Sequence, residues 1–272
     1  MSIYVLFEIV FLAIVQGIAE FLPISSSGHL AVISNLFNFD PESSVQVNII
    51  LHAGTLTSIL VFYFKELISL LKFNAPDRKL IIAIIIGTIP AGIVGVALKK
   101  SGIADQLFND PLVSGIGFLI TATMLLFAMK TKKENNLTAQ ELSPGKALLI
   151  GLAQAVAILP GISRSGSTIA AGLKAGLKSA DCAKFSFMLA IPAIGGAAFL
   201  ELLSALKKQE LAVNSPSMLF LAIGFAVSAA VGYIALTLLL KILNRGKLNV
   251  FAWYLYAVGT IVVTWRLIVI FT

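Results

Sequence analysis

The sequence predicts an all-α polytopic membrane protein, and three observations lead to this fold class. The chain of 272 residues is 58% hydrophobic and only 12% charged, which leaves too few polar side chains to cover a water-soluble surface. Ten apolar segments follow one another, separated by polar stretches. At two points the apolar sequence is interrupted by a proline and a run of hydroxyl side chains, which an ordinary membrane helix does not contain.

The apolar segments form two sets of five. The first set is Ile3–Leu22, Gly28–Phe39, Val47–Phe64, Leu80–Leu98 and Leu112–Met129, and the second is Ala147–Leu159, Ser167–Leu177, Phe185–Leu203, Met218–Leu240 and Val250–Phe271. Crossing the hydrocarbon takes about 20 helical residues. The second segment of each set is too short to cross.

We expect each short helix to pair with the helix before it as a re-entrant hairpin, with the break at its tip. Three spanning helices then follow in each half, and an odd number of crossings inverts the second half relative to the first, as in many transporters. The prediction is one membrane domain over residues 1–272, built from two inverted repeats at about 1–135 and 140–272.

Matches between the two halves support a duplication. At an offset of 138, five residues of the first half face identical residues of the second, which are Gln154, Ile162, Ser163, Ser165 and Gly166. At an offset of 137, Gly87, Val94 and Gly95 face Gly224, Val231 and Gly232. Matches in the same order and at nearly the same offset favour an internal repeat.

The basic residues indicate the orientation in the membrane. The net charge is +7, but the basic side chains lie in loops rather than in one patch, so no nucleic-acid partner is expected. The predicted topology puts 14 of them on one side, in stretches 65–79, 130–146, 174–184 and 241–247, and 5 on the other. The positive-inside rule assigns the richer side to the cytoplasm. Both termini then face outward, and the hairpin tips meet near the midplane with a site that opens to the outer side.

The two breaks mark this site. They lie within QGIAEFLPISSSGHL, residues 16–30, and QAVAILPGISRSGST, residues 154–168. Irregular backbone at membrane depth is tolerated only where it is buried in protein or lines a polar cavity. Hydroxyls and free N–H groups at the start of a helix bind anions. Simple helix capping is the alternative for each hydroxyl alone.

Ionisable side chains beside the breaks strengthen the prediction of an anion site. Glu20 lies one helical turn after Gln16, and an acid at membrane depth is expected to be functional. The planar guanidinium of Arg164 suits two-point binding of phosphate or carboxylate. His29 follows the first loop and is a candidate general acid or base. The alternatives are a purely structural pairing of Glu20 with Arg164 and a packing role for His29.

The motifs QGIAEFLPISSSGH and PGISRSGST resemble the two signature motifs of the undecaprenyl-diphosphate phosphatases of the BacA (UppP) family, and the likeness spans the chain in length and segment order. The resemblance implies an enzyme of the bacterial plasma membrane that hydrolyses undecaprenyl diphosphate to undecaprenyl phosphate and phosphate. That reaction recycles the lipid carrier of peptidoglycan synthesis, which serves cell-wall biogenesis and cell shape, and confers bacitracin resistance.

Motif matching implies a catalytic set of four residues, which are Glu20, Ser26, His29 and Arg164. The expected substrate-binding residues are the polar and glycine positions around them, namely Gln16, Ser25, Ser27, Gly28, Ser163, Ser165, Gly166 and Thr168. Ser26 is expected to attack the terminal phosphorus or to orient a water that does, with His29 and Glu20 moving protons.

A divalent cation, Mg²⁺ or Ca²⁺, is implied as a cofactor that bridges phosphate oxygens and Glu20. The family accepts Glu or Gln at the first motif position, which is Gln16 here, and a glutamine weakens the case for a carboxylate pair around a metal. The alternative function is an inverted-repeat anion transporter or polyprenyl-phosphate flippase, which has no need of Glu20, Ser26 and His29 together. The sequence does not determine the oligomeric state, and a homodimer is one possibility. It also gives no role for Cys182.

Overall fold

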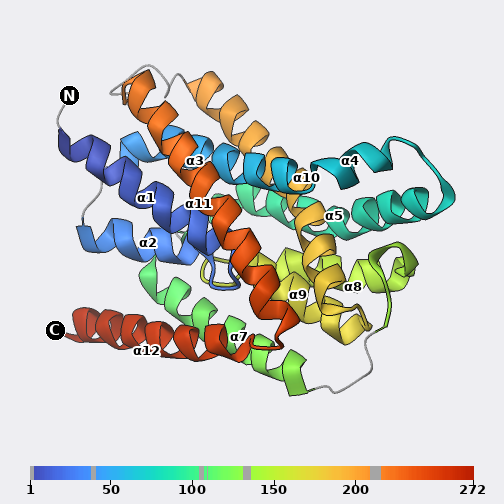
Figure 1. Cartoon of the computed structure of the whole chain (residues 1–272). Coiled ribbons are helices and arrows are strands. Elements are labelled where there is room, and N and C mark those ends of the chain that lie inside the picture. Colours follow the sequence, from blue (N-terminus) through green and yellow to red (C-terminus); the bar gives the residue numbers. More distant parts are fainter. Residues whose placement is uncertain (1–2, 38–40, 104–106, 109, 131–135, 209–215) are drawn as a thin grey trace.

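The computed structural model of the chain describes residues 3–37, 41–103, 107–108, 110–130, 136–208 and 216–272. Within these residues the protein is built from α-helices (Figure 1). The helices are α1 (Ile3–Phe21), α2 (Ser26–Phe37), α3 (Pro41–Phe62), α4 (Phe64–Leu70), α5 (Ala75–Ser101), α7 (Pro111–Lys130), α8 (Pro144–Val156), α9 (Arg164–Ala175), α10 (Ser179–Lys208), α11 (Met218–Asn244) and α12 (Asn249–Phe271), with a short 3₁₀ turn, η1 (Ala139–Glu141), before α8.

Each of the ten predicted apolar segments contains a helix, so the all-α polytopic fold is confirmed. Six helices, α1, α5, α7, α10, α11 and α12, are long and apolar enough to cross a membrane. The segment that begins at Gln46 bends by 73° between α3 and α4, at the end of the predicted segment Val47–Phe64, and α4 was not predicted. Because α1 is also long enough to cross, its pairing with α2 as a re-entrant hairpin stays a prediction.

Capping residues explain where the second half starts its helices. Ser143 accepts a hydrogen bond from the backbone N–H of Lys146 at 3.4 Å, and proline follows it at the first position of α8. Ser163 caps α9 in the same way, and α9 ends at Gly176 with a φ of +93°, a left-handed conformation that favours glycine. Both ends of α9 are therefore set by local sequence.

Glycines allow close approach in two extensive helix contacts, α12 with α7 and α1 with α11. α12 lies along α7 (Figure 1), and a Cβ on Gly259 would lie 3.0 Å from the carbonyl oxygen of Gly115. α1 packs against α11, where a Cβ on Gly17 would lie 2.9 Å from Val231. Small residues at such crossings let membrane helices approach closely.

Two of the helix contacts between the halves exchange equivalent partners. α1 packs on α11 of the second half, and α8 packs on α5 of the first half. Gly224 of α11 faces Ile9, and Gly87 of α5 faces Ala147, which are pairs related by the sequence offsets of 137 and 138. The internal repeat stays a prediction, and this exchange of partners supports it.

The apolar side chains divide between a core around the breaks and an outer face. Phe21 and Phe187 are fully buried and meet edge to face with ring centroids 5.5 Å apart. Large apolar side chains such as Ile85 and Trp253 are instead exposed on the outer faces of α5 and α12. Exposed apolar faces of this kind are expected where helices contact lipid rather than water.

Candidate active site

The two sequence breaks lie against each other in the folded chain. The Ser165 hydroxyl donates to the carbonyl oxygen of Leu22 at 3.2 Å. A Cβ on Gly28 would lie 2.7 Å from Cα of Gly161, so only a hydrogen side chain fits there. The loop between α1 and α2 and the loop between α8 and α9 therefore lie in contact, as the sequence predicted, and their role as one functional site stays a prediction.

Glu20 is the centre of this site. Its side chain is only 7% exposed, and three neighbours donate hydrogen bonds to its carboxylate. Arg164 Nη2 contacts Oε1 at 2.6 Å, while the Ser26 hydroxyl at 2.6 Å and Gln16 Nε2 at 3.1 Å contact Oε2. Both carboxylate oxygens therefore accept hydrogen bonds, one from Arg164 and the other from Ser26 and Gln16. Glu20 is thus placed to accept the Ser26 proton.

The turn before α2 brings Ser26 to the carboxylate. Ser25 has a φ of +70°, a left-handed conformation that is costly for a residue with a Cβ and is found at functional sites. Its side-chain oxygen lies 3.4 Å from the backbone nitrogen of Gly28 and 3.4 Å from the Ser27 hydroxyl. The strained turn lets α2 begin at Ser26, directly opposite Glu20.

The second loop uses the same local design. Ser163 Oγ accepts from the backbone N–H of Gly166 at 3.0 Å and lies 3.1 Å from Ser165 Oγ. Both serines are 1% exposed. Thr168 is also 1% exposed, and its hydroxyl lies 2.6 Å from Ser186 Oγ. These hydroxyls hold the loop and α9 in place, and their predicted contacts with substrate stay predictions.

Arg164 reaches the site from the first residue of α9. Besides Glu20, its Nη1 contacts the carbonyl oxygen of Ser186 in α10 at 3.3 Å. Its side chain is 15% exposed, about twice as much as Glu20. The guanidinium carries five N–H donors, and these two contacts leave others for an incoming anion. Ser186 lies outside both motifs, so only the packing of α10 against α9 identifies it.

His29 has hydrogen-bond partners other than Glu20 and Ser26. Its Nδ1 lies 2.8 Å from the carbonyl oxygen of Ser25, and its Nε2 lies 2.8 Å from the hydroxyl of Tyr254 in α12. The structure thus brings together Glu20, Ser26 and Arg164 by hydrogen bonds, and it places His29 beside them with different partners. Tyr254 is 225 residues away in sequence, and no motif pointed to it.

Comparison with known proteins places this arrangement in a family. The family model described as "Bacitracin resistance protein BacA" matches residues 9–261. The chain belongs to the BacA family. It is 42% identical over 258 residues to an undecaprenyl-diphosphatase of Rhodopirellula baltica, with 95% of this chain and 97% of the relative covered. It is also 40% identical to an undecaprenyl-diphosphatase of Parabacteroides distasonis, with 96% and 98% covered.

A metal at this BacA-family site would find few protein ligands. In the described part of the chain, no three His, Cys, Asp or Glu side chains gather as a metal site. The side-chain oxygen of Gln16 is buried without a hydrogen-bond partner and belongs to the same amide that contacts Glu20. One carboxylate and one amide oxygen fit a Mg²⁺ ion whose other ligands are water and substrate phosphates.

Gly161 allows the second BacA motif to pack against α7. Its φ is +82°, and a Cβ there would overlap the carbonyl oxygen of Ser114. We expect Gly161→Ala to lower the free energy of unfolding by roughly 2 to 6 kcal/mol, from backbone strain plus overpacking. Thermal unfolding in detergent measures this change. Gly92→Ala is the control, since nothing lies within 4 Å of its added Cβ; equal transitions for both variants would contradict the tight packing.

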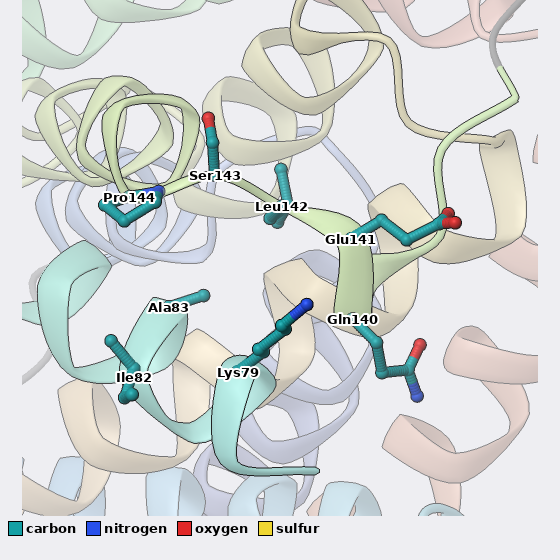
Figure 2. Close-up of a pocket in the computed structure, with 8 residues that line it drawn as sticks. All are labelled: Lys79, Ile82, Ala83, Gln140, Glu141, Leu142, Ser143 and Pro144. Atoms are coloured by element: carbon teal, nitrogen blue, oxygen red, sulfur yellow. The ribbon is translucent and has the colours of Figure 1, made fainter. Parts of the chain in front are cut away.

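A separate hollow of about 360 Å³ lies between α5 and the turn before α8 (Figure 2). It is lined by Lys79, Ile82, Ala83, Gln140, Glu141, Leu142, Ser143 and Pro144, none of which was a predicted site residue. Glu141 accepts from the backbone N–H and the hydroxyl of Thr138, both at 2.8 Å, and these bonds lower the pKa of its carboxyl. The carboxylate of Glu141 therefore has a structural role, the capping of η1.

Proposed function

We propose that this protein hydrolyses undecaprenyl diphosphate to undecaprenyl phosphate and inorganic phosphate. The names of its relatives support this activity, and so does one feature of the site. Glu20 accepts hydrogen bonds from a serine hydroxyl and an arginine on its two carboxylate oxygens. A base, a nucleophile and an anion-binding cation are the parts that phosphate hydrolysis needs.

The surroundings suit a substrate with a charged head and a long apolar tail. Arg164 would bind the diphosphate and offset the negative charge that it carries in the transition state. The exposed apolar faces of the helices contact the same lipid phase as the isoprenoid tail. Recycling of this lipid carrier links the protein to peptidoglycan synthesis, and faster recycling is the proposed basis of bacitracin resistance.

In the proposed reaction Ser26 is the nucleophile and Glu20 its base. Ser26 Oγ attacks the terminal phosphorus, its proton passes to Glu20, and the bond from that phosphorus to the bridging oxygen breaks. Undecaprenyl phosphate leaves, and a water then hydrolyses the phosphoserine, which restores the Ser26 hydroxyl and releases phosphate. The 2.6 Å hydrogen bond from Ser26 to Glu20 supports this assignment. His29 would serve the proton transfers of the leaving group or of the water.

A divalent cation, Mg²⁺ or Ca²⁺, would be held by Glu20 and the unpaired oxygen of Gln16. It would neutralise charge on the phosphate oxygens. The residues of the chain keep their roles beside it: Arg164 binds the anion, and Glu20 takes the proton.

Phosphate release from undecaprenyl diphosphate by purified protein in detergent tests the function. We expect turnover that rises with protein concentration and falls when a chelator is added, and recovery when Mg²⁺ or Ca²⁺ is restored. Release no faster than from buffer alone, with or without cation, would reject the hydrolase.

We also propose a plasma-membrane location with both termini outside, and thiol labelling tests it. In a Cys182→Ser background, single cysteines replace Ser101, Thr272, Lys72 and Lys247, which are all exposed. We expect an impermeant maleimide to label cysteines at positions 101 and 272 in intact cells. Those at positions 72 and 247 should react only after permeabilisation. Labelling of Ser101→Cys and Lys72→Cys from the same side would contradict the orientation. Dimer formation stays a prediction.

A further inference from the structure

Tyr254 is the residue of α12 that contacts the predicted catalytic histidine. Its hydroxyl lies 2.8 Å from His29 Nε2, and the two rings are nearly parallel, at 7° with centroids 5.7 Å apart. Tyr254 is 42% exposed, whereas Glu20 is buried. The contact is therefore more exposed than Glu20, and it joins the first motif to α12.

The partners of His29 determine which ring nitrogen can exchange a proton. The carbonyl oxygen of Ser25 can only accept, so Nδ1 carries a hydrogen and donates it. In the neutral imidazole Nε2 then holds the lone pair and accepts from Tyr254; in the charged imidazole Nε2 donates to the same oxygen. A phenol hydroxyl can serve both forms. Tyr254 thus faces the nitrogen on which any acid or base role of His29 depends.

We infer that Tyr254 is a positioning residue that acts through His29, an inference that rests on the proposed phosphatase function. Ser25 and Tyr254 hold the imidazole at its two nitrogens, which stops rotation of the ring. Phe118 lies beside the ring with centroids 4.7 Å apart and limits its tilt. Without the Tyr254 hydroxyl, Nε2 loses its fixed direction toward the exposed side, although the aromatic packing persists.

The alternative is that Tyr254 only packs against the His29 ring, in which case its hydroxyl is not needed. A second tyrosine of α12 provides a matched control. Tyr256 also uses its hydroxyl for one contact with a neighbouring helix, at 2.9 Å from Thr123 Oγ1 of α7. It lies two residues from Tyr254 and contacts none of the four predicted catalytic residues within the described contacts. Tyr254→Phe and Tyr256→Phe therefore remove similar hydrogen bonds, but only the first touches His29.

Kinetics of these variants give the first test. We expect Tyr254→Phe to lower kcat about tenfold with KM within about twofold, because positioning affects the chemical step more than binding. Tyr256→Phe should stay within about twofold of the parent. In a His29→Gln background, Tyr254→Phe should have no further effect, since residues that act as one unit are not additive. The inference would be overturned if Tyr254→Phe lowered kcat equally in the parent and in His29→Gln, or did not lower it in the parent.

The two histidines of the chain allow a test that does not depend on turnover. His52 also directs Nδ1 to a backbone carbonyl four residues earlier, that of Asn48 at 2.8 Å, so it is an internal reference. In protein labelled with nitrogen-15 histidine, Tyr254→Phe should move the Nε2 resonance of His29 and leave His52 unchanged. An unchanged His29 resonance would show that no such hydrogen bond forms. Full activity of His29→Gln would instead reject the proposed role of His29.

Discussion

Glu20→Gln is expected to lower kcat by about a thousandfold, within the range by which general bases accelerate reactions. The amide keeps the size of the side chain but cannot take the proton of the Ser26 hydroxyl, whose oxygen lies 2.6 Å from Glu20 Oε2. It also removes the charge that pairs with Arg164 at 2.6 Å. Steady-state phosphate release, normalised to folded protein, measures the loss.

The control for this variant must separate chemistry from folding. Breaking a buried ion pair costs about 3–5 kcal/mol of stability, so folded protein is counted by size exclusion and thermal unfolding in detergent. Glu201→Gln changes an exposed glutamate of α10 and should stay within about twofold of the parent. Folded Glu20→Gln with more than about a tenth of parent kcat would reject Glu20 as the base.

Arg164→Lys is expected to lower kcat/KM by about a hundredfold, the loss typical of one missing transition-state donor. Lysine keeps the positive charge but replaces the planar fork with a single point. Arg164 uses two nitrogens at once, Nη2 toward Glu20 and Nη1 toward Ser186, and lysine cannot make both contacts while it binds phosphate.

The control for Arg164→Lys is Arg266→Lys. Arg266 of α12 pairs at 3.7 Å with Asp110, the residue before α7. It is therefore an arginine in an ion pair outside the two breaks. We expect its turnover to stay within about twofold of the parent. If Arg164→Lys did the same, the geometry of the guanidinium would not be needed for substrate binding.

The sequence predicted the helices because apolar runs of membrane length leave few alternatives. It did not predict α4, which follows the bend at Tyr63, and no proline or glycine marks that bend. The turn η1 could have been predicted from the sequence, because Thr138 and Glu141 have the spacing of a capping box. Local patterns thus predicted most of the helices, while the bend beside Phe62 and Tyr63 has no local signal in the sequence.

The candidate site was predictable where it lies within the two motifs. The grouping of Glu20, Ser26 and Arg164 followed from polar groups at membrane depth, and the structure joins them by hydrogen bonds. The partners of His29 and Arg164 outside the motifs, Tyr254 and Ser186, were not predictable. Their roles depend on how α12 and α10 pack, which a single sequence does not encode as a local pattern.

The most direct test of the central claim is a rapid-quench search for phosphate bound to Ser26. Protein is mixed with substrate labelled on the terminal phosphate, quenched within one turnover, digested and sequenced by mass spectrometry. We expect a phosphorylated Ser26 peptide in the parent protein and none in Ser26→Ala, which should also lose turnover. Repeated absence of the adduct, together with appreciable turnover by Ser26→Ala, would contradict attack by Ser26 and leave water as the nucleophile.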